Sequence, residues 1–348
     1  MQTIRLMKYG RTIFSLAFGL LFTGVAHAQP LKVCATVPEL GSLVQEIGCD
    51  RATVTVFAKG TEDPHFLIPK PSYIKALSTC DVYIQGGLDL EVGWAPRLLQ
   101  NARNADILPG GRGYIDASVA ITPLGVPTVT IDRSMGHVHA LGNPHYLLDP
   151  LNGLRVARLL RDRLSAMHPG SADYFSQRYQ NFRYRLGTAL VGETLFNKYD
   201  FEKLAVLTER GRLDTFLKSQ REESLLAGWL GQLSAYRGSK VVSDHQGWPY
   251  FAQRFGLDIV ECLESLPGVL PTTQHLNEVI TLMKAQGVKV VLATAYYDPR
   301  YAQFVSENTG ATVVHMAHQP GARPNTDSYL SMVDYNIKQL TAAFGEAA

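Results

Sequence analysis

Three histidines lie close together in the middle of the chain. His137, His139 and His145 occur within one short segment of a 348-residue sequence that has only ten histidines. An Asn-Pro pair directly precedes the last of them and an Asp-Pro pair soon follows, so the segment is rich in turns. Imidazoles held in loops are accessible to a metal ion, and borderline metals such as zinc take nitrogen ligands readily. The segment therefore predicts that at least one of these histidines binds a metal.

Three further potential ligands come after predicted strands. They are His65 after strand 53–58, His245 after strand 240–243, and Asp327 after strand 311–316. In parallel sheets, ligands bind beyond the carboxyl ends of the strands. We therefore expect His65, His145, His245 and Asp327 to converge from four loops on a cleft between two sheets. Asp327 has a second interpretation, because an aspartate just before a helix is a common N-cap.

The predicted ligand set indicates which metal would bind. Three imidazoles and one carboxylate suit Zn²⁺ in tetrahedral geometry, with bonds of roughly 2.0–2.2 Å. Calcium and magnesium require more oxygen ligands, and manganese or iron sites usually contain more carboxylates. His245 in place of an acid therefore favours zinc, although copper or nickel could bind by affinity alone. Asp244 beside His245 leaves open which of the two side chains points inward.

The segments that must position these ligands predict an α/β protein. The fold class is two lobes, each with a mainly parallel sheet flanked by helices, because strands and helices alternate with short links. Residues 151–190 have helical periodicity interrupted at Pro169-Gly170, and 191–235 are interpreted as helices with a polar connection. The predicted strands are 31–37, 53–58 and 81–87 in the first lobe and 240–243, 258–263, 288–294 and 311–316 in the second. The predicted divisions are an N-terminal metal-binding lobe at 29–150, a linking helical section at 151–238 and a C-terminal metal-binding lobe at 239–348.

Residues 1–28 are predicted to be a secretory signal peptide. A basic start precedes the apolar run Ile13–Val25, and Ala26-His27-Ala28 supplies a small-x-small cleavage pattern before Gln29. The apolar run is shorter than the ~20 residues needed to span a bilayer, which argues against an uncleaved anchor. No cysteine lies at the cleavage point for lipid attachment. We expect a soluble periplasmic protein after cleavage near Ala28.

Net charge and cysteine spacing exclude two further kinds of function, nucleic-acid binding and a cysteine zinc site. Cleavage removes three positive charges from 33 and none from the 31 acidic residues, leaving a net charge of −1. With no basic patch, nucleic acid is not expected as a partner. Cys34, Cys49, Cys80 and Cys262 form no CxxC pair, which argues against a cysteine zinc site. A Cys49–Cys80 disulfide is the favoured pairing in an oxidising compartment, and buried free thiols are the alternative.

The chain resembles the periplasmic zinc/manganese-binding receptors of ABC transporters, the group that includes adhesin-like metal-binding lipoproteins. The resemblance covers nearly all of residues 31–345. It implies two lobes bridged by one long helix, with little hinge motion on metal binding, and ligands at His65, His145, His245 and Asp327. It also marks the histidine at position 245 as the zinc-type choice, where manganese-type members have Glu. The matching motifs are Asp63-Pro64-His65, Asn143-Pro144-His145 with Leu148-Asp149-Pro150, Asp244-His245 with Tyr250-Phe251, and Asp327-Ser328-Tyr329 through Tyr335-Asn336.

Two segments depart from that family pattern. Residues 191–225 are longer than the usual linker, with no function assigned to them. Many zinc-type members have a long His/Asp-rich loop, of which only His137-Val138-His139 corresponds here. Plain surface exposure is the favoured interpretation of His137 and His139, and relay of zinc to the site is the alternative.

The resemblance implies a high-affinity receptor that is not an enzyme. It would bind Zn²⁺ as transported cargo and pass it to a membrane permease powered by a cytoplasmic ATPase. Alternatives are a receptor for manganese or another divalent metal, and a periplasmic zinc chaperone. A zinc hydrolase is disfavoured, because four protein ligands would fill the tetrahedron and no HExxH motif is present. The expected partners are the zinc ion, the permease and a periplasmic metallochaperone, and the protein is expected to be a monomer.

Overall fold

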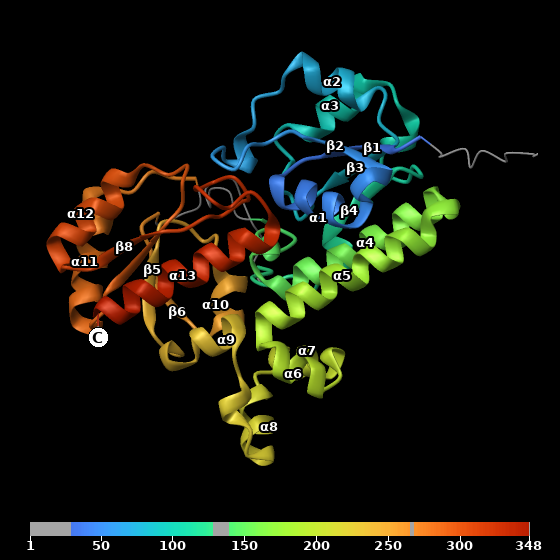
Figure 1. Cartoon of the computed structure of the whole chain (residues 1–348). Coiled ribbons are helices and arrows are strands. Elements are labelled where there is room, and N and C mark those ends of the chain that lie inside the picture. Colours follow the sequence, from blue (N-terminus) through green and yellow to red (C-terminus); the bar gives the residue numbers. More distant parts are fainter. Residues whose placement is uncertain (1–28, 128–138, 265–267, 348) are drawn as a thin grey trace, which may run out of the picture.

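The computed structural model describes residues 29–127, 139–264 and 268–347, and its described part contains two parallel four-stranded sheets (Figure 1). The predicted α/β class with two sheet-containing lobes is confirmed. The sheets have equivalent strand orders, β2-β1-β3-β4 and β6-β5-β7-β8. The strands of the first sheet are β1 (Leu31–Ala35), β2 (Ala52–Val56), β3 (Val82–Gln85) and β4 (Tyr114–Asp116). Those of the second are β5 (Lys240–Ser243), β6 (Asp258–Cys262), β7 (Val290–Ala293) and β8 (Thr312–His315).

The predicted signal peptide, residues 1–28, lies outside the described residues. Among the helices within them, none is both long enough and apolar enough to cross a membrane.

Helices cover both faces of the first sheet. On one face lies α1 (Pro38–Gly48), which begins with a proline at its first turn and buries apolar residues at helical spacing, Leu40, Leu43, Val44 and Ile47. A separate apolar cluster joins α2 (Pro71–Leu77) and α3 (Ala95–Ala102) with Cys34 and Tyr83 of the sheet. The lobe thus has the layered core expected of parallel strands.

Two long helices follow the first lobe and pack beside each other against α1. These are α4 (Pro150–Met167) and α5 (Ala172–Val191), separated at Pro169-Gly170 as the sequence predicted. The expected long helix is therefore α5, which has α4 as a companion of similar length. The chain then passes through α6 (Glu193–Lys198), α7 (Phe201–Glu209), α8 (Leu213–Gln220) and α9 (Gly228–Gln232). Figure 1 shows α8 projecting from the bottom of the molecule.

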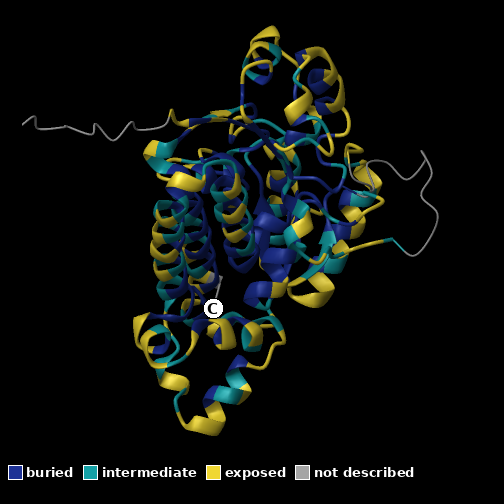
Figure 2. Ribbon diagram, turned by 90° about the vertical axis from the view of Figure 1, so that its right-hand side faces the viewer, coloured by how far each residue is buried: buried dark blue, intermediate teal, exposed yellow. Residues whose placement is uncertain are grey.

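The second sheet has its own helical cover but shares a core with the first. Its helices are α10 (Pro249–Phe255), α11 (Thr273–Gln286), α12 (Pro299–Thr309) and α13 (Tyr329–Ala347). One apolar cluster contains residues of α1, α4, α5, α10 and α13 together with strands of both sheets. Tyr329 at the start of α13 donates to Leu147 O at 2.7 Å, and its backbone N–H donates to Ser42 Oγ at 2.8 Å. Buried segments therefore continue through the middle of the molecule (Figure 2), so the two lobes do not form independent cores.

A buried ion pair also joins the two halves of the chain. Arg254 in α10 donates through Nε and Nη2 to the Asp149 carboxylate at 2.8 and 2.6 Å, and each side chain is only 6% exposed. Asp149 also caps α4, accepting from Leu151 N at 2.9 Å. The start of α4 is thereby fixed to the second lobe.

All four cysteines are free thiols, so the Cys49–Cys80 disulfide predicted from the sequence is absent. The buried Cys80 thiol instead donates to Leu77 O at 3.5 Å, and its interaction with the buried Cys34 thiol raises the pKa of Cys34 and lowers that of Cys80. Cys34 lies on β1, and Cys80 lies two residues before β3, the neighbouring strand. Strand adjacency, which the sequence alone did not specify, determines this pairing.

Two carboxyl groups are buried where α1 and the β3 loop meet. Glu91 accepts from Thr36 Oγ1 at 2.6 Å and from the backbone N–H groups of Gly86 and Gly87. Glu39 Oε2 has no hydrogen-bond partner among the described residues. Burial raises the pKa of Glu39 to about 8 and that of Glu91 to about 7. The folded protein therefore keeps protons that the unfolded chain would lose.

Replacing Glu39 with glutamine should stabilise the metal-free protein at pH 8 but not near pH 4. Above pH 4.5 the unfolded carboxyl ionises while the folded one stays protonated, so the parent loses stability as the pH rises towards 8. Each pKa unit is worth about 1.4 kcal/mol, which gives an expected gain of about 2–4 kcal/mol at pH 8. Urea unfolding at both pH values measures it, with exposed Glu307→Gln as the control. An equal gain at both pH values would contradict burial as the cause.

Candidate metal centre

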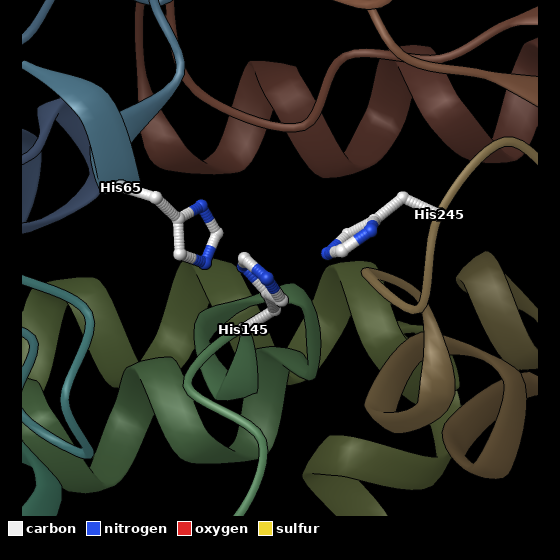
Figure 3. A group of neighbouring side chains, drawn as sticks. All are labelled: His65, His145 and His245. Carbon is white, nitrogen blue, oxygen red and sulfur yellow. The ribbon is translucent and has the colours of Figure 1, made fainter. Parts of the chain in front are cut away.

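Three histidines from three separate loops meet between the lobes (Figure 3). One ligand atom from each of His65, His145 and His245 lies within 4.8 Å of those of the other two. The ring centroids are 5.1 Å apart for His65 and His145, 6.1 Å for His65 and His245, and 5.9 Å for His145 and His245. The structure thus brings together three of the four residues that the sequence suggested as ligands. We call these three residues the histidine trio.

His65 is held by the loop that follows β2. Asp63 caps the short 3-10 helix Pro64–Phe66, and its Oδ1 accepts from His65 N at 2.9 Å and from His65 Nδ1 at 2.7 Å. Burial alone would raise the pKa of the Asp63 carboxyl, but its hydrogen bonds with His65 and the charge of that ring outweigh burial and lower it. An ionised Asp63 fixes the proton of His65 on Nδ1, which leaves the Nε2 lone pair for a ligand.

His145 is the most enclosed member of the trio. It is 5% exposed, and its Nε2 has no hydrogen-bond partner in the described part of the chain. Its backbone N–H donates to Asn143 Oδ1 at 3.0 Å, while Asn143 Nδ2 donates to Gln246 O at 2.7 Å, which ties this loop to the second lobe. Burial, with a smaller contribution from the surrounding imidazoles, lowers the pKa of His145 well below its usual value. The ring is therefore neutral and able to bind a metal.

His245 follows β5 at the carboxyl edge of the second sheet. Its Nδ1 lies 2.8 Å from Glu264 Oε2, and the ring is largely buried. The neighbouring Asp244 carboxylate interacts instead with the backbone N–H and, at 3.2 Å, the hydroxyl of Thr294. Burial raises the pKa of Asp244 to about 6, partly opposed by those hydrogen bonds. Of the two adjacent side chains, His245 is the one that belongs to the trio.

A further histidine, which the sequence analysis missed, lies against the trio. His318 is 3% exposed, and both of its ring nitrogens lack hydrogen-bond partners among the described residues. Its ring centroid is 4.7 Å from that of His145, with the planes at 81°. Burial, assisted by the His245 and His65 rings, lowers the pKa of His318 to about 3. The rule that selected His65 and His245 could have selected it, because it comes soon after strand β8.

The remaining sequence-based candidates have different positions. Asp327 is exposed just ahead of α13 and is not part of the trio. His139 is half-buried, and its Nε2 lies 3.1 Å from His65 Nε2, so it is located at the centre itself. His137 lies outside the described residues. The interpretation of plain surface exposure therefore does not fit His139.

Two cavities flank the trio. One of about 360 Å³ is lined by His139, His145 and His245 together with residues of β6, and another of about 520 Å³ is lined by His65, His139 and Trp94 among others. Solvent and small ions can therefore approach the imidazoles from two sides. Buried imidazole nitrogens are the donor set that a divalent borderline metal prefers.

Comparisons with known proteins match most of the chain to one family. Residues 33–190 and 219–343 match the family described as the periplasmic component A of zinc-uptake complexes. The unmatched stretch between them contains α6, α7 and most of α8, and it lies within residues 191–225, which were predicted to exceed the usual linker.

Individual relatives are distant in sequence but similar in length. The chain is 25% identical over 319 residues to the manganese ABC transporter substrate-binding lipoprotein PsaA of Streptococcus pneumoniae, covering 90% of this chain and 88% of that one. It is 20% identical over 330 residues to the manganese-binding lipoprotein MntA of Halalkalibacterium halodurans, covering 93% and 92%. A crystal structure of ZnuA superposes with a TM-score of 0.65 at 20% identity, covering 90% of this chain and 99% of that one. A cadmium-bound periplasmic metal-binding protein from Candidatus Liberibacter asiaticus gives 0.64 at 15% identity, covering 90% and 98%.

Proposed function

Because the chain belongs to the family of periplasmic zinc-uptake component A and is a substrate-binding protein of a metal ABC transporter, we propose that it captures Zn²⁺ in the periplasm and delivers it to the permease. The observation that carries this proposal is the buried trio of His65, His145 and His245. The family consists of solute-binding receptors, which supports transport over hydrolysis. The predicted leader at 1–28 supports the periplasmic location.

Manganese is the alternative cargo, because several relatives are named as manganese-binding. The types of donor atom at the centre argue against manganese. Manganese sites favour oxygen ligands, whereas all three members of the trio offer nitrogen. The nearby carboxylates of Asp63 and Glu264 contact the Nδ1 atoms of the imidazoles. Zinc therefore fits the described groups better.

We propose His318 as the fourth ligand. Its two unpartnered nitrogens and its contact with the His145 ring support it, whereas Asp327 is exposed. Since the trio itself does not include His318, a small shift of its side chain towards the metal is part of this proposal. Asp327 remains the alternative that the sequence motif suggested.

Metal titration of chelator-stripped protein tests both proposals. We expect one Zn²⁺ per chain, with affinity for Zn²⁺ well above that for Mn²⁺ in competition. His318→Ala should weaken zinc binding at least tenfold, whereas Asp327→Ala and exposed His315→Ala should change it less than threefold. Tighter binding of Mn²⁺ than of Zn²⁺ would overturn the choice of metal. A large loss in Asp327→Ala with none in His318→Ala would exchange their roles.

A further inference from the structure

Two carboxylates, one in each lobe, contact the Nδ1 atoms of two histidines of the trio. Asp63 Oδ1 lies 2.7 Å from His65 Nδ1, and Glu264 Oε2 lies 2.8 Å from His245 Nδ1. In both pairs the carboxylate engages Nδ1, so Nε2 is the nitrogen that can face a metal, although His65 Nε2 here lies 3.1 Å from His139 Nε2. His65 and His245 come from different sheets, and the same arrangement therefore occurs on both sides of the cleft.

We propose that Asp63 and Glu264 are positioning residues that hold His65 and His245 in the metal-binding tautomer and make the centre selective for divalent over monovalent cations. This inference rests on the proposed function, because it assigns a role in recognition of the cargo. Neither residue would touch the ion, since each acts through an imidazole.

Both carboxylates are themselves fixed in place. Asp63 also accepts from the backbone N–H of His65 at 2.9 Å, and Glu264 accepts from Gly268 N at 3.2 Å. The side chains of Asp63 and Glu264 are only 21% and 8% exposed, so solvent screens their charges weakly. A rigid acceptor on Nδ1 fixes both the ring orientation and the site of its proton.

Charge provides the selectivity. The attraction between a carboxylate and a cation is proportional to the cation's charge, so removing one negative charge costs a divalent ion twice the free energy it costs a monovalent ion at the same position. Outer partners of metal-binding histidines typically contribute 10–100-fold in affinity. A variant that loses only the charge should therefore lose about 10–100-fold for Zn²⁺ and roughly the square root of that factor, about 3–10-fold, for Ag⁺.

Isosteric substitutions separate charge from orientation. In Glu264→Gln and Asp63→Asn, the amide oxygen can still accept from Nδ1 while the negative charge is lost. In Glu264→Ala both are lost, so the other tautomer of His245 should become populated. Glu307→Gln is the control, because Glu307 is exposed on α12 and its carboxylate accepts from Gln303 Nε2 at 3.0 Å, away from the cavities beside the trio.

The experiment titrates the full mature chain with Zn²⁺ and, in chloride-free buffer, with Ag⁺, and records the His245 tautomer by ¹⁵N–¹H NMR. The expected result is a Zn²⁺/Ag⁺ affinity ratio that falls at least threefold in Asp63→Asn and Glu264→Gln and stays constant in Glu307→Gln. The tautomer should change only in Glu264→Ala. An unchanged ratio in both isosteric variants, with the parent still binding zinc, would overturn this inference alone. A parent chain that binds neither Zn²⁺ nor Mn²⁺ would overturn the proposed function as well.

Discussion

Replacing His145 with alanine should lower zinc affinity more than 100-fold, the largest effect expected of any single substitution at the centre. Loss of an outer partner already costs about 10–100-fold, and a direct ligand contributes more. His145 is also neutral and buried with an unpartnered Nε2, so it binds a metal without first losing a proton or a hydrogen bond. Competition titration of chelator-stripped protein against a zinc indicator measures the change.

Thermal unfolding provides a second measurement on the same variant. Ligand at 1,000 times its Kd stabilises a protein by about 4 kcal/mol, so zinc should raise the Tm of the parent clearly and that of His145→Ala hardly at all. His315→Ala, which alters an exposed histidine on β8, should keep the full zinc-dependent rise. If His145→Ala bound zinc within tenfold of the parent, the metal would have to bind elsewhere.

Replacing Arg254 with methionine should destabilise the fold by about 3–5 kcal/mol, because it leaves the Asp149 carboxylate buried without its partner. Urea unfolding of the metal-free protein at pH 7 measures the loss. Arg237→Met breaks the more exposed pair with Asp214 and should cost no more than about 1 kcal/mol.

A double variant identifies the cause of that loss. Asp149→Asn combined with Arg254→Met removes the stranded charge while keeping an amide oxygen to cap α4, so much of the lost stability should return. If the double variant were as unstable as Arg254→Met alone, lost packing of the arginine would explain the effect rather than the unpaired carboxylate.

Most of the fold could be predicted from the spacing of apolar residues and from the positions of proline and glycine. Strands such as Val290–Ala293 are continuous apolar runs, and the break between α4 and α5 coincides with Pro169-Gly170. Strand β4 was not predicted, because Tyr114–Asp116 is too short to have a pattern and exists only through its pairing with β3. Its position in the sheet is a tertiary effect.

The centre was predictable as far as the strand-end rule applies. His65 and His245 follow strands at the carboxyl edges of their sheets, and the turn-rich segment around His145 indicated the third member. The final loop is the exception. It is long, so its end at Asp327 has turned away to solvent, while His318 near its beginning is buried beside His145. A motif position within such a loop does not specify which residue faces inward.

The side chains that contact and orient the imidazoles could not be predicted from the sequence. Glu264 lies two residues after β6, and its contact with His245 depends on the pairing of β5 with β6, whose register is irregular between Val241 and Val242. The choice between Asp244 and His245 depends likewise on Thr294 at the end of β7. Such contacts between neighbouring strands arise only once the sheet has formed.

The unequal sharing of the trio between the lobes has a consequence for unloading. His65 follows β2 of the first sheet and His245 follows β5 of the second, whereas His145 lies in a loop that hydrogen bonds tie to the second lobe. If a transporter separated the lobes, the cargo would lose its bond to His65 and keep those to His145 and His245. The second lobe would then retain the ion. Extraction would have to take place from the half that holds His145, the least accessible of the three.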